Sequence, residues 1–204
     1  TVKSPKSFNS QIGLPLSLLQ IDKKHELGIF EVGISKPLEM DNQEHIFHPK
    51  IGLLTHMGSA HSANFASEEE LIREKLKLFK NADVIFYNAD NALTDHTIKH
   101  LYASKKLTSY GLKNNNDIHI ISDVYDRKKD ISIQYFDEVI VLPISQRDEA
   151  TLTNVLALIG ILKELKISNS DIKEKIDALK AIEMRLESIE GIKNNLIIND
   201  SYNL

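Results

Sequence analysis

Apolar runs that alternate with helical patterns constrain the fold of this chain more than any other feature of its sequence. Residues 27–30, 51–55 and 84–87 are continuously apolar and have the length of strands. Helical patterns over 67–80 and 95–106 follow the second and third runs. Strands that are apolar throughout are buried on both faces, so the sequence predicts an α/β fold with a mostly parallel sheet covered by helices.

Polar residues follow each of these runs. Glu31 ends the first, Thr55 and His56 end the second, and Asn88 to Asp90 end the third. In open α/β sheets, ligands bind at the carboxyl ends of the strands. Glu31 with His61, in the loop after the second strand, is a plausible ligand pair for a hard divalent cation. The alternative is that Glu31 caps a neighbouring helix or pairs with Lys75.

The helix over 67–80 carries an unexpected cation. Ser67 and Glu70 form a capping box, which fixes the helix start. On a helical wheel one face is apolar (Leu71, Ile72, Leu76, Leu78, Phe79) and the other is polar (Glu69, Glu70, Arg73, Glu74, Lys77). Lys75 falls inside the apolar face. Its stem could lie along the core while the ammonium reaches water, or the lysine could serve chemistry.

The rest of the chain predicts a change of architecture. No strand or helix is expected before Pro15. Shorter alternating segments between 108 and 143 favour a small antiparallel portion. Asp148 is expected to cap a long helix over 149–165, and Ser170 a further one. The last segment is typical of two strands around a turn at Gly191.

Composition excludes several functions. The 204 residues carry a net charge of −4, which gives no basic field for nucleic acid, and contain no cysteine for disulfide or thiolate chemistry. With no secretory signal or membrane-spanning run, we expect a cytoplasmic protein. The sequence has no G-x-x-x-x-G-K-[ST], G-x-G-x-x-G or G-x-S-x-G motif. Any bound nucleotide would therefore be held partly by residues outside this chain.

Six ordered blocks carry a family resemblance: SPKSFNSQIGLPLSLL, IFEVGISKPLEM, IGLLTHMGSAHSANFASEEELIREKLKLF, VIFYNAD, DEATLTNVLALIGIL and EMRLESIEGIKNNLIINDSYN. They resemble the central ATPase domain of the Mur ligases. Within that family they are most similar to the branch that adds D-alanyl-D-alanine, including its forms fused to an alanine racemase domain.

The resemblance implies a P-loop NTPase-like domain that begins after its own P-loop. Residues 1–198 would be the central domain, truncated at its N-terminus, and 199–204 the start of the C-terminal ligase domain. It also implies a cytoplasmic ligase of peptidoglycan precursor synthesis that uses ATP and Mg²⁺. Its partners would be UDP-N-acetylmuramoyl-tripeptide, D-alanyl-D-alanine and the flanking domains of the same chain. The tripeptide carboxylate would become an acyl phosphate, which the dipeptide amine attacks.

The resemblance also implies roles for individual residues. Glu31 would be the first magnesium ligand and His61 the ligand of a second site. Lys75 would carry a carbamate that helps hold that second ion, which would explain a lysine on the apolar face. His61 and Lys75 are therefore also the candidate catalytic residues.

Four more residues would hold the nucleotide. They are Asn154 for adenine, Arg185 for the phosphates, Asp200 for the ribose and Asn9 near the γ-phosphate. Without the family these have ordinary interpretations, since Asn154 and Arg185 could be surface residues and Asp200 a turn residue.

Some positions depart from the family pattern. His56 stands where asparagine is usual, Ser62 and Ala63 replace leucine and an acid, and Leu38 replaces a common glycine. Two alternatives therefore stay open. One is a non-catalytic binding module that lost the P-loop, and the other is a sibling ligase of the Mur or folylpolyglutamate synthetase type.

Overall fold

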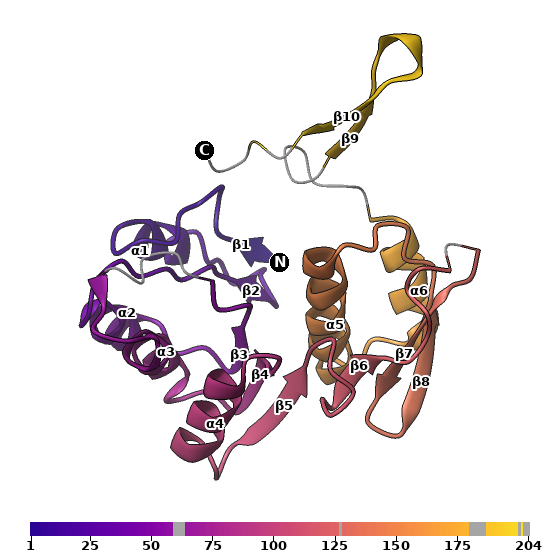
Figure 1. Cartoon of the computed structure of the whole chain (residues 1–204). Helices are drawn as coiled ribbons and strands as arrows, with labels where there is room; N and C mark the ends of the chain where they lie inside the picture. The colour runs from indigo at the N-terminus through magenta and orange to yellow at the C-terminus, as the bar shows by residue number, and fades with distance from the viewer. Residues whose placement is uncertain (59–63, 127, 180–186, 200, 202–204) are drawn as a thin grey trace.

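A computed structural model describes residues 1–58, 64–126, 128–179, 187–199 and 201 (Figure 1). Its main feature is a six-stranded sheet in the order β3-β4-β5-β6-β7-β8. The strands are β3 (Ile51–Leu54), β4 (Val84–Asn88), β5 (Lys106–Tyr110), β6 (Ile118–Ile120), β7 (Ile131–Tyr135) and β8 (Glu138–Leu142). Pairing is parallel from β3 to β6 and antiparallel from β6 to β8. The predicted parallel sheet with a small antiparallel portion is confirmed.

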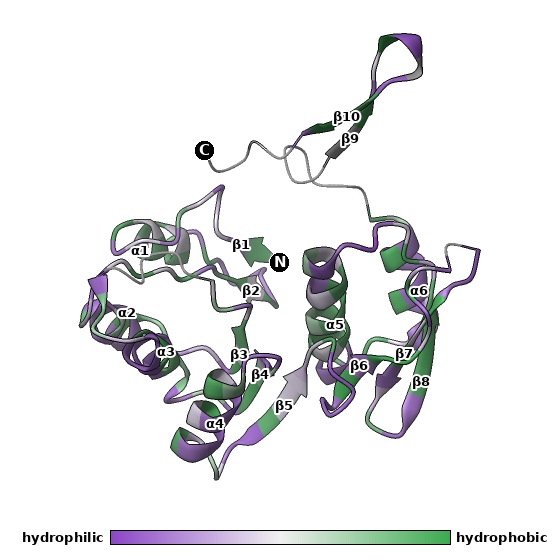
Figure 2. Cartoon of the chain, in the orientation of Figure 1, coloured by the Kyte–Doolittle hydropathy of each residue, from purple (hydrophilic) through white to green (hydrophobic). Residues whose placement is uncertain are grey.

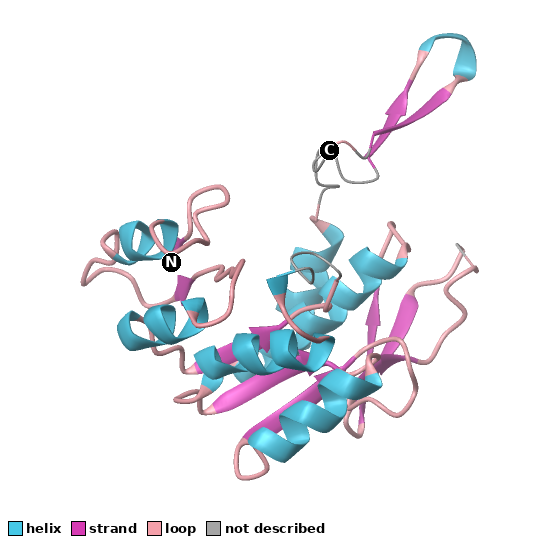
Figure 3. Cartoon of the chain, turned by 60° about the vertical axis from the view of Figure 1, so that its left-hand side comes forward, coloured by secondary structure: helices cyan, strands magenta, loops and turns pink. Residues whose placement is uncertain are grey.

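Helices cover both faces of the sheet, as β4 demonstrates. Successive strand residues point to opposite faces. Val84 and Phe86 pack with α5 (Glu149–Glu164), whereas Ile85 and Tyr87 pack with α3 (Glu68–Leu76) and α4 (Ala92–Leu101). The cyan helices in Figure 3 lie on both sides of the magenta sheet. All five residues of β4 are buried, which explains why this strand is apolar almost throughout.

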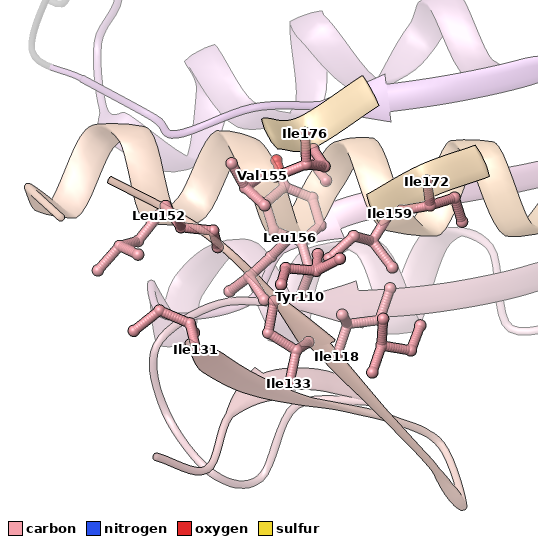
Figure 4. Packing of buried hydrophobic residues seen from close by; sticks show 14 of the residues in the cluster. Tyr110, Ile118, Ile131, Ile133, Leu152, Val155, Leu156, Ile159, Ile172 and Ile176 are labelled. Atoms are coloured by element: carbon pink, nitrogen blue, oxygen red, sulfur yellow. The ribbon is translucent and has the colours of Figure 1, made fainter. Parts of the chain in front are cut away.

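The first of the two cores lies between α5, α6 (Asn169–Asp177) and strands β4 to β8. Ile118, Ile131 and Ile133 meet Leu156 and Ile159 there (Figure 4). Gly160 lets α5 approach the sheet closely, because a Cβ at this position would lie 2.8 Å from the Phe86 ring. The long helix and its Asp148 cap are as predicted, with Asp148 accepting the Thr151 N–H at 2.9 Å.

The N-terminal region differs from the prediction. Gly28–Ile29 forms a short strand, β2, which pairs in parallel with β1 (Val2–Lys3) in a separate sheet, and both β2 residues are exposed. The prediction of a buried strand over 27–30 was therefore wrong. The prediction of no element before Pro15 was also wrong, because β1 precedes it and α1 (Gly13–Leu18) begins two residues earlier. A further helix, α2 (Glu39–Ile46), had no apolar pattern to predict it.

Helix α3 begins where the capping box placed it, with Ser67 Oγ accepting the Glu70 N–H at 3.1 Å. A 3₁₀ turn, η2 (Lys77–Phe79), continues it. The helical wheel was wrong about Glu74, which it placed on the polar face. Only 5% of this residue is exposed, because α2 packs over that side of α3.

The segment after β4 was predicted with wrong bounds. Helix α4 begins earlier, with Asn91 Oδ1 accepting the N–H groups of Leu93 and Thr94, and ends at Leu101. Leu101, at the end of this helix, is 40% exposed. Residues 102–105 of the predicted helix form a turn, and its last residue, Lys106, begins strand β5, which was not predicted because Thr108 and Ser109 interrupt the apolar pattern.

The C-terminal elements follow the prediction with one correction. Ser168, not Ser170, caps α6 by accepting the Asp171 N–H at 3.2 Å. Strands β9 (Glu187–Glu190) and β10 (Leu196–Asn199) form an antiparallel hairpin around Gly191, with η3 (Ile192–Asn194) in its turn. Ile197 and Ile198 are exposed on opposite faces of β10, which is green in Figure 2.

In the described ranges, no helix combines the length and the apolar composition that a bilayer crossing requires.

Candidate functional site

Two of the predicted site residues are joined by a hydrogen bond. Asn9 Nδ2 donates to Glu31 Oε1 at 2.8 Å, although 22 residues separate the two in sequence. The Glu31 N–H donates to Ser4 Oγ, and Gly33 N–H donates to the Asn9 carbonyl at 2.7 Å. The Glu31 carboxylate is exposed, so it is oriented by an amide and open to solvent. An exposed, oriented carboxylate suits a hard cation.

The loop that carries His61 returns to the same segment. His61 itself lies outside the described residues. Asn64, three residues later, donates from Nδ2 to the Ser35 carbonyl at 2.9 Å. Ser35 is four residues after Glu31, so the chain just beyond His61 is bonded to the segment that follows the carboxylate.

Lys75 lies on α3 as a half-buried side chain. Within the described ranges it makes no hydrogen bond or ion pair. Burial lowers the pKa of Lys75 below its usual value, because the charged form loses hydration without gaining a partner. A larger fraction of the amine is therefore neutral, and the neutral amine is the nucleophilic form.

The predicted nucleotide residues are spread along the chain. Asn154 is exposed on α5, with no partner among the residues that the structure describes. Arg185 and Asp200 lie outside those residues, as His61 does. The described part of the chain holds no group of three histidine, aspartate or glutamate side chains that could bind a metal ion.

The third polar strand end, Asn88 to Asp90, has a structural role. Asp90 accepts the N–H groups of Leu112 and Lys113 at 2.7 and 3.0 Å, and the Asn116 side chain at 3.1 Å. Gly111 lies against it, and a Cβ there would be 2.3 Å from Asp90 Oδ1. The carboxylate of Asp90 thus holds the connection between β5 and β6.

Sequence reasoning missed the link between α2 and α3. Glu74 Oε1 accepts the Met40 N–H at 3.1 Å, and Lys77 bridges Glu74 at 2.7 Å and Asp41 at 2.6 Å. The only sequence signal was the spacing of Glu74 and Lys77, which are three residues apart on one helix.

Comparison with known proteins identifies the family. A model of the Mur ligase middle domain matches residues 1–162. The chain belongs to the Mur ligase family. Among curated Mur ligases, the UDP-N-acetylmuramoyl-tripeptide–D-alanyl-D-alanine ligases of Bacillus subtilis and Borreliella burgdorferi are 28% and 29% identical to it. These matches cover 98% and 100% of this chain but 43% and 44% of the relatives. The chain thus spans less than half the length of the Mur ligases it matches.

Solved structures show the same fold. MurF from Acinetobacter baumannii superposes on the whole chain with a TM-score of 0.87 at 19% identity, over 45% of its own length. MurF from Thermotoga maritima in complex with ADP has a TM-score of 0.81 at 23% identity, covering 99% of this chain and 47% of its own. The predicted Mur ligase central-domain fold is confirmed.

Proposed function

We propose that the full-length protein is an ATP-dependent amide ligase that adds D-alanyl-D-alanine to UDP-N-acetylmuramoyl-tripeptide. The observation that carries this proposal is the extent of the similarity. Relatives that bear the name of this activity match the chain along its whole length. A folylpolyglutamate synthase from Thermotoga maritima superposes with a TM-score of only 0.61. The sibling reaction is therefore the less favoured one.

Glu31 is the proposed ligand of the magnesium ion that accompanies ATP. The hydrogen bond from Asn9 orients one carboxylate oxygen and leaves the group exposed. His61 is proposed to reach the same region, since Asn64 bonds to the segment after Glu31. Bound Mg²⁺ would supply positive charge to the phosphates and to the charge that develops during transfer.

Lys75 is proposed to act as its carbamate. The neutral amine attacks the carbon of CO₂, a nitrogen–carbon bond forms, one carbon–oxygen π pair moves to oxygen, and a proton leaves to solvent. The product is an anion with two oxygen donors, which suits a hard cation. Burial favours this reaction, because it lowers the pKa of Lys75 and raises the neutral fraction.

The remaining proposed roles concern the nucleotide. Asn154 is exposed on α5 and is proposed to bond the adenine edge. Arg185 is proposed for the phosphates, Asp200 for the ribose and Asn9 for the region of the γ-phosphate. A cytoplasmic location, a domain boundary at residue 198 and a fused racemase domain stay predictions.

The test measures ADP and the peptide product formed by the full-length protein. ADP and UDP-muramoyl-pentapeptide should form only when the tripeptide precursor and D-alanyl-D-alanine are both present. Replacing both substrates by a folate and L-glutamate should give neither. ADP formation with the folate and L-glutamate would favour the sibling reaction, and no ADP with either substrate pair would contradict a ligase of these two kinds.

Lys75→Ala should lower kcat at least about 10³-fold, because no carbamate can form and the anion is lost. Bicarbonate should not restore activity. Lys80→Ala is the matched control, since Lys80 is an exposed lysine at the end of the same helical segment. Near wild-type turnover of Lys75→Ala would remove Lys75 from the mechanism while leaving the ligase reaction intact.

A further inference from the structure

We propose that Glu74 is a positioning residue, which holds the Glu31 segment at a fixed place relative to Lys75. This inference rests on the proposed function, because it concerns the same site. Glu74 is adjacent to Lys75 in α3 but points to the other helix, α2. It therefore links α3, which carries Lys75, to α2, which is bonded to the segment that follows Glu31.

The contacts of the Glu74 side chain join α3 to α2. The carboxylate is almost fully buried, and its Oε1 accepts the Met40 N–H in the first turn of α2. Such N–H groups have no partner within their own helix, and the helix dipole favours an anion there. Lys77 supplies the countercharge at 2.7 Å and also bonds Asp41 of α2. A buried carboxylate with these partners has a well-defined position.

Helix α2 is also hydrogen-bonded to the loop that follows Glu31. Glu39 Oε2 accepts the N–H groups of Ser35 and Lys36 at 2.6 and 3.1 Å. Gln43 is buried and donates to the Gly33 carbonyl at 3.0 Å. These bonds fold the segment 33–36 back onto α2, so a movement of α2 moves the chain beside Glu31.

The two helices have a second, apolar contact. Met40 is buried in the same core as Leu71 and Ile72 of α3. Helix α2 also packs against η2, the continuation of α3, so apolar packing holds the two segments together, whereas the hydrogen bond of Glu74 fixes Met40 at the start of α2. Loss of the bond should leave the fold in place and loosen the start of α2. Outer residues that orient ligands typically change metal affinity about 10- to 100-fold when they are removed.

The experiment compares four forms of the full-length protein: wild type, Glu74→Ala, Glu74→Gln and Glu69→Gln. The glutamine variant keeps an oxygen for the Met40 N–H and loses the charge. Glu69→Gln is the matched control, because Glu69 is on the same helix and pairs only with the exposed Arg73 within the described residues. Two quantities are measured, namely Mn²⁺ affinity by electron paramagnetic resonance with ADP present, and amide hydrogen exchange over 31–46.

Glu74→Ala should weaken Mn²⁺ binding about tenfold and speed exchange at Met40. Glu74→Gln should recover part of both, and Glu69→Gln should match wild type. Unchanged Mn²⁺ affinity with a lowered Tm would assign Glu74 a purely structural role and overturn the inference. If Glu74→Ala does not fold, the same criterion applies to Glu74→Gln. Failure of the proposed function has a separate signature, which is wild-type protein that forms no ADP with both substrates.

Discussion

Leu38 has a backbone conformation that a residue with a side chain adopts only at a cost. It precedes α2 with φ +69°, in the left-handed region, and 68% of its surface is exposed. This conformation destabilises a residue that has a Cβ by about 1–2 kcal/mol. The family resemblance gives glycine as the common residue at this position, and the backbone supplies the physical reason.

Leu38→Gly should therefore stabilise the fold by about 0.5 kcal/mol. Relief of about 1 kcal/mol of backbone strain is partly offset by the greater freedom of glycine in the unfolded chain. Urea unfolding followed by circular dichroism measures the difference. Leu38→Ala keeps the Cβ and should show no gain, and an equal gain in both variants would point to solvation instead of backbone strain.

The helical wheel was correct for Lys75 and wrong for its neighbour Glu74. Both predictions used the same periodicity, which reports only which way a side chain leaves the helix. Whether that direction meets solvent or another helix depends on α2, whose residues Glu39–Ile46 have no apolar stripe that could have predicted it. The oriented pair of Asn9 and Glu31 was likewise predictable as residue types, but not as a contact across 22 residues.

Asp148, which caps the N-terminus of helix α5, should make the stability of the protein depend on pH. Burial has the largest single effect on the pKa of Asp148 and would raise it, but hydrogen bonds from Thr151, Gln146 and its own N–H together outweigh burial, so the pKa is lowered from its usual value of 3.8. A carboxylate with a depressed pKa adds stability above the unfolded pKa and loses it as pH falls through the folded one. Asp148→Ala should cost about 1 kcal/mol at pH 7.

The deficit of Asp148→Ala should begin to shrink as pH falls through about 3.8, where the carboxyl of the unfolded chain takes up a proton, and should shrink further until the folded cap is protonated at a lower pH. Unfolding free energies at pH 7 and at acid pH measure this difference. Asp148→Asn retains a capping oxygen but loses the charge, so its stability at pH 7 should lie between those of wild type and Asp148→Ala. A deficit for Asp148→Ala that is independent of pH would mean that the charge contributes nothing.

Elements were predictable from sequence where the apolar pattern was complete. Strand β4 and helix α5 are buried along whole faces, and their signals were unambiguous. Strand β5 was missed because its Thr108 and Ser109 are buried polar residues. Ser109 is satisfied by Asp117, whose Oδ2 accepts both its N–H and its hydroxyl at 2.7 Å. A local pattern does not reveal a partner eight residues away.

At the scale of the whole molecule, the chain should lack activity when produced as residues 1–204. Its sequence has no glycine-rich phosphate-binding loop, so ATP would lose most of its contacts. A coupled assay should detect no ADP formation above background. The full-length protein at the same concentration is the control, and equal turnover by the isolated chain would show that the missing loop is not needed.

The contact between Gly111 and Asp90 restricts the order in which amino-acid substitutions can occur at these two positions during evolution. Any larger residue at 111 would collide with the acid that holds the loop from Leu112 to Asn116. In evolution, Asp90 would have to be replaced first, which would weaken the loop, before position 111 could hold a residue larger than glycine. We therefore expect the two positions to covary, with glycine at 111 wherever aspartate occupies 90.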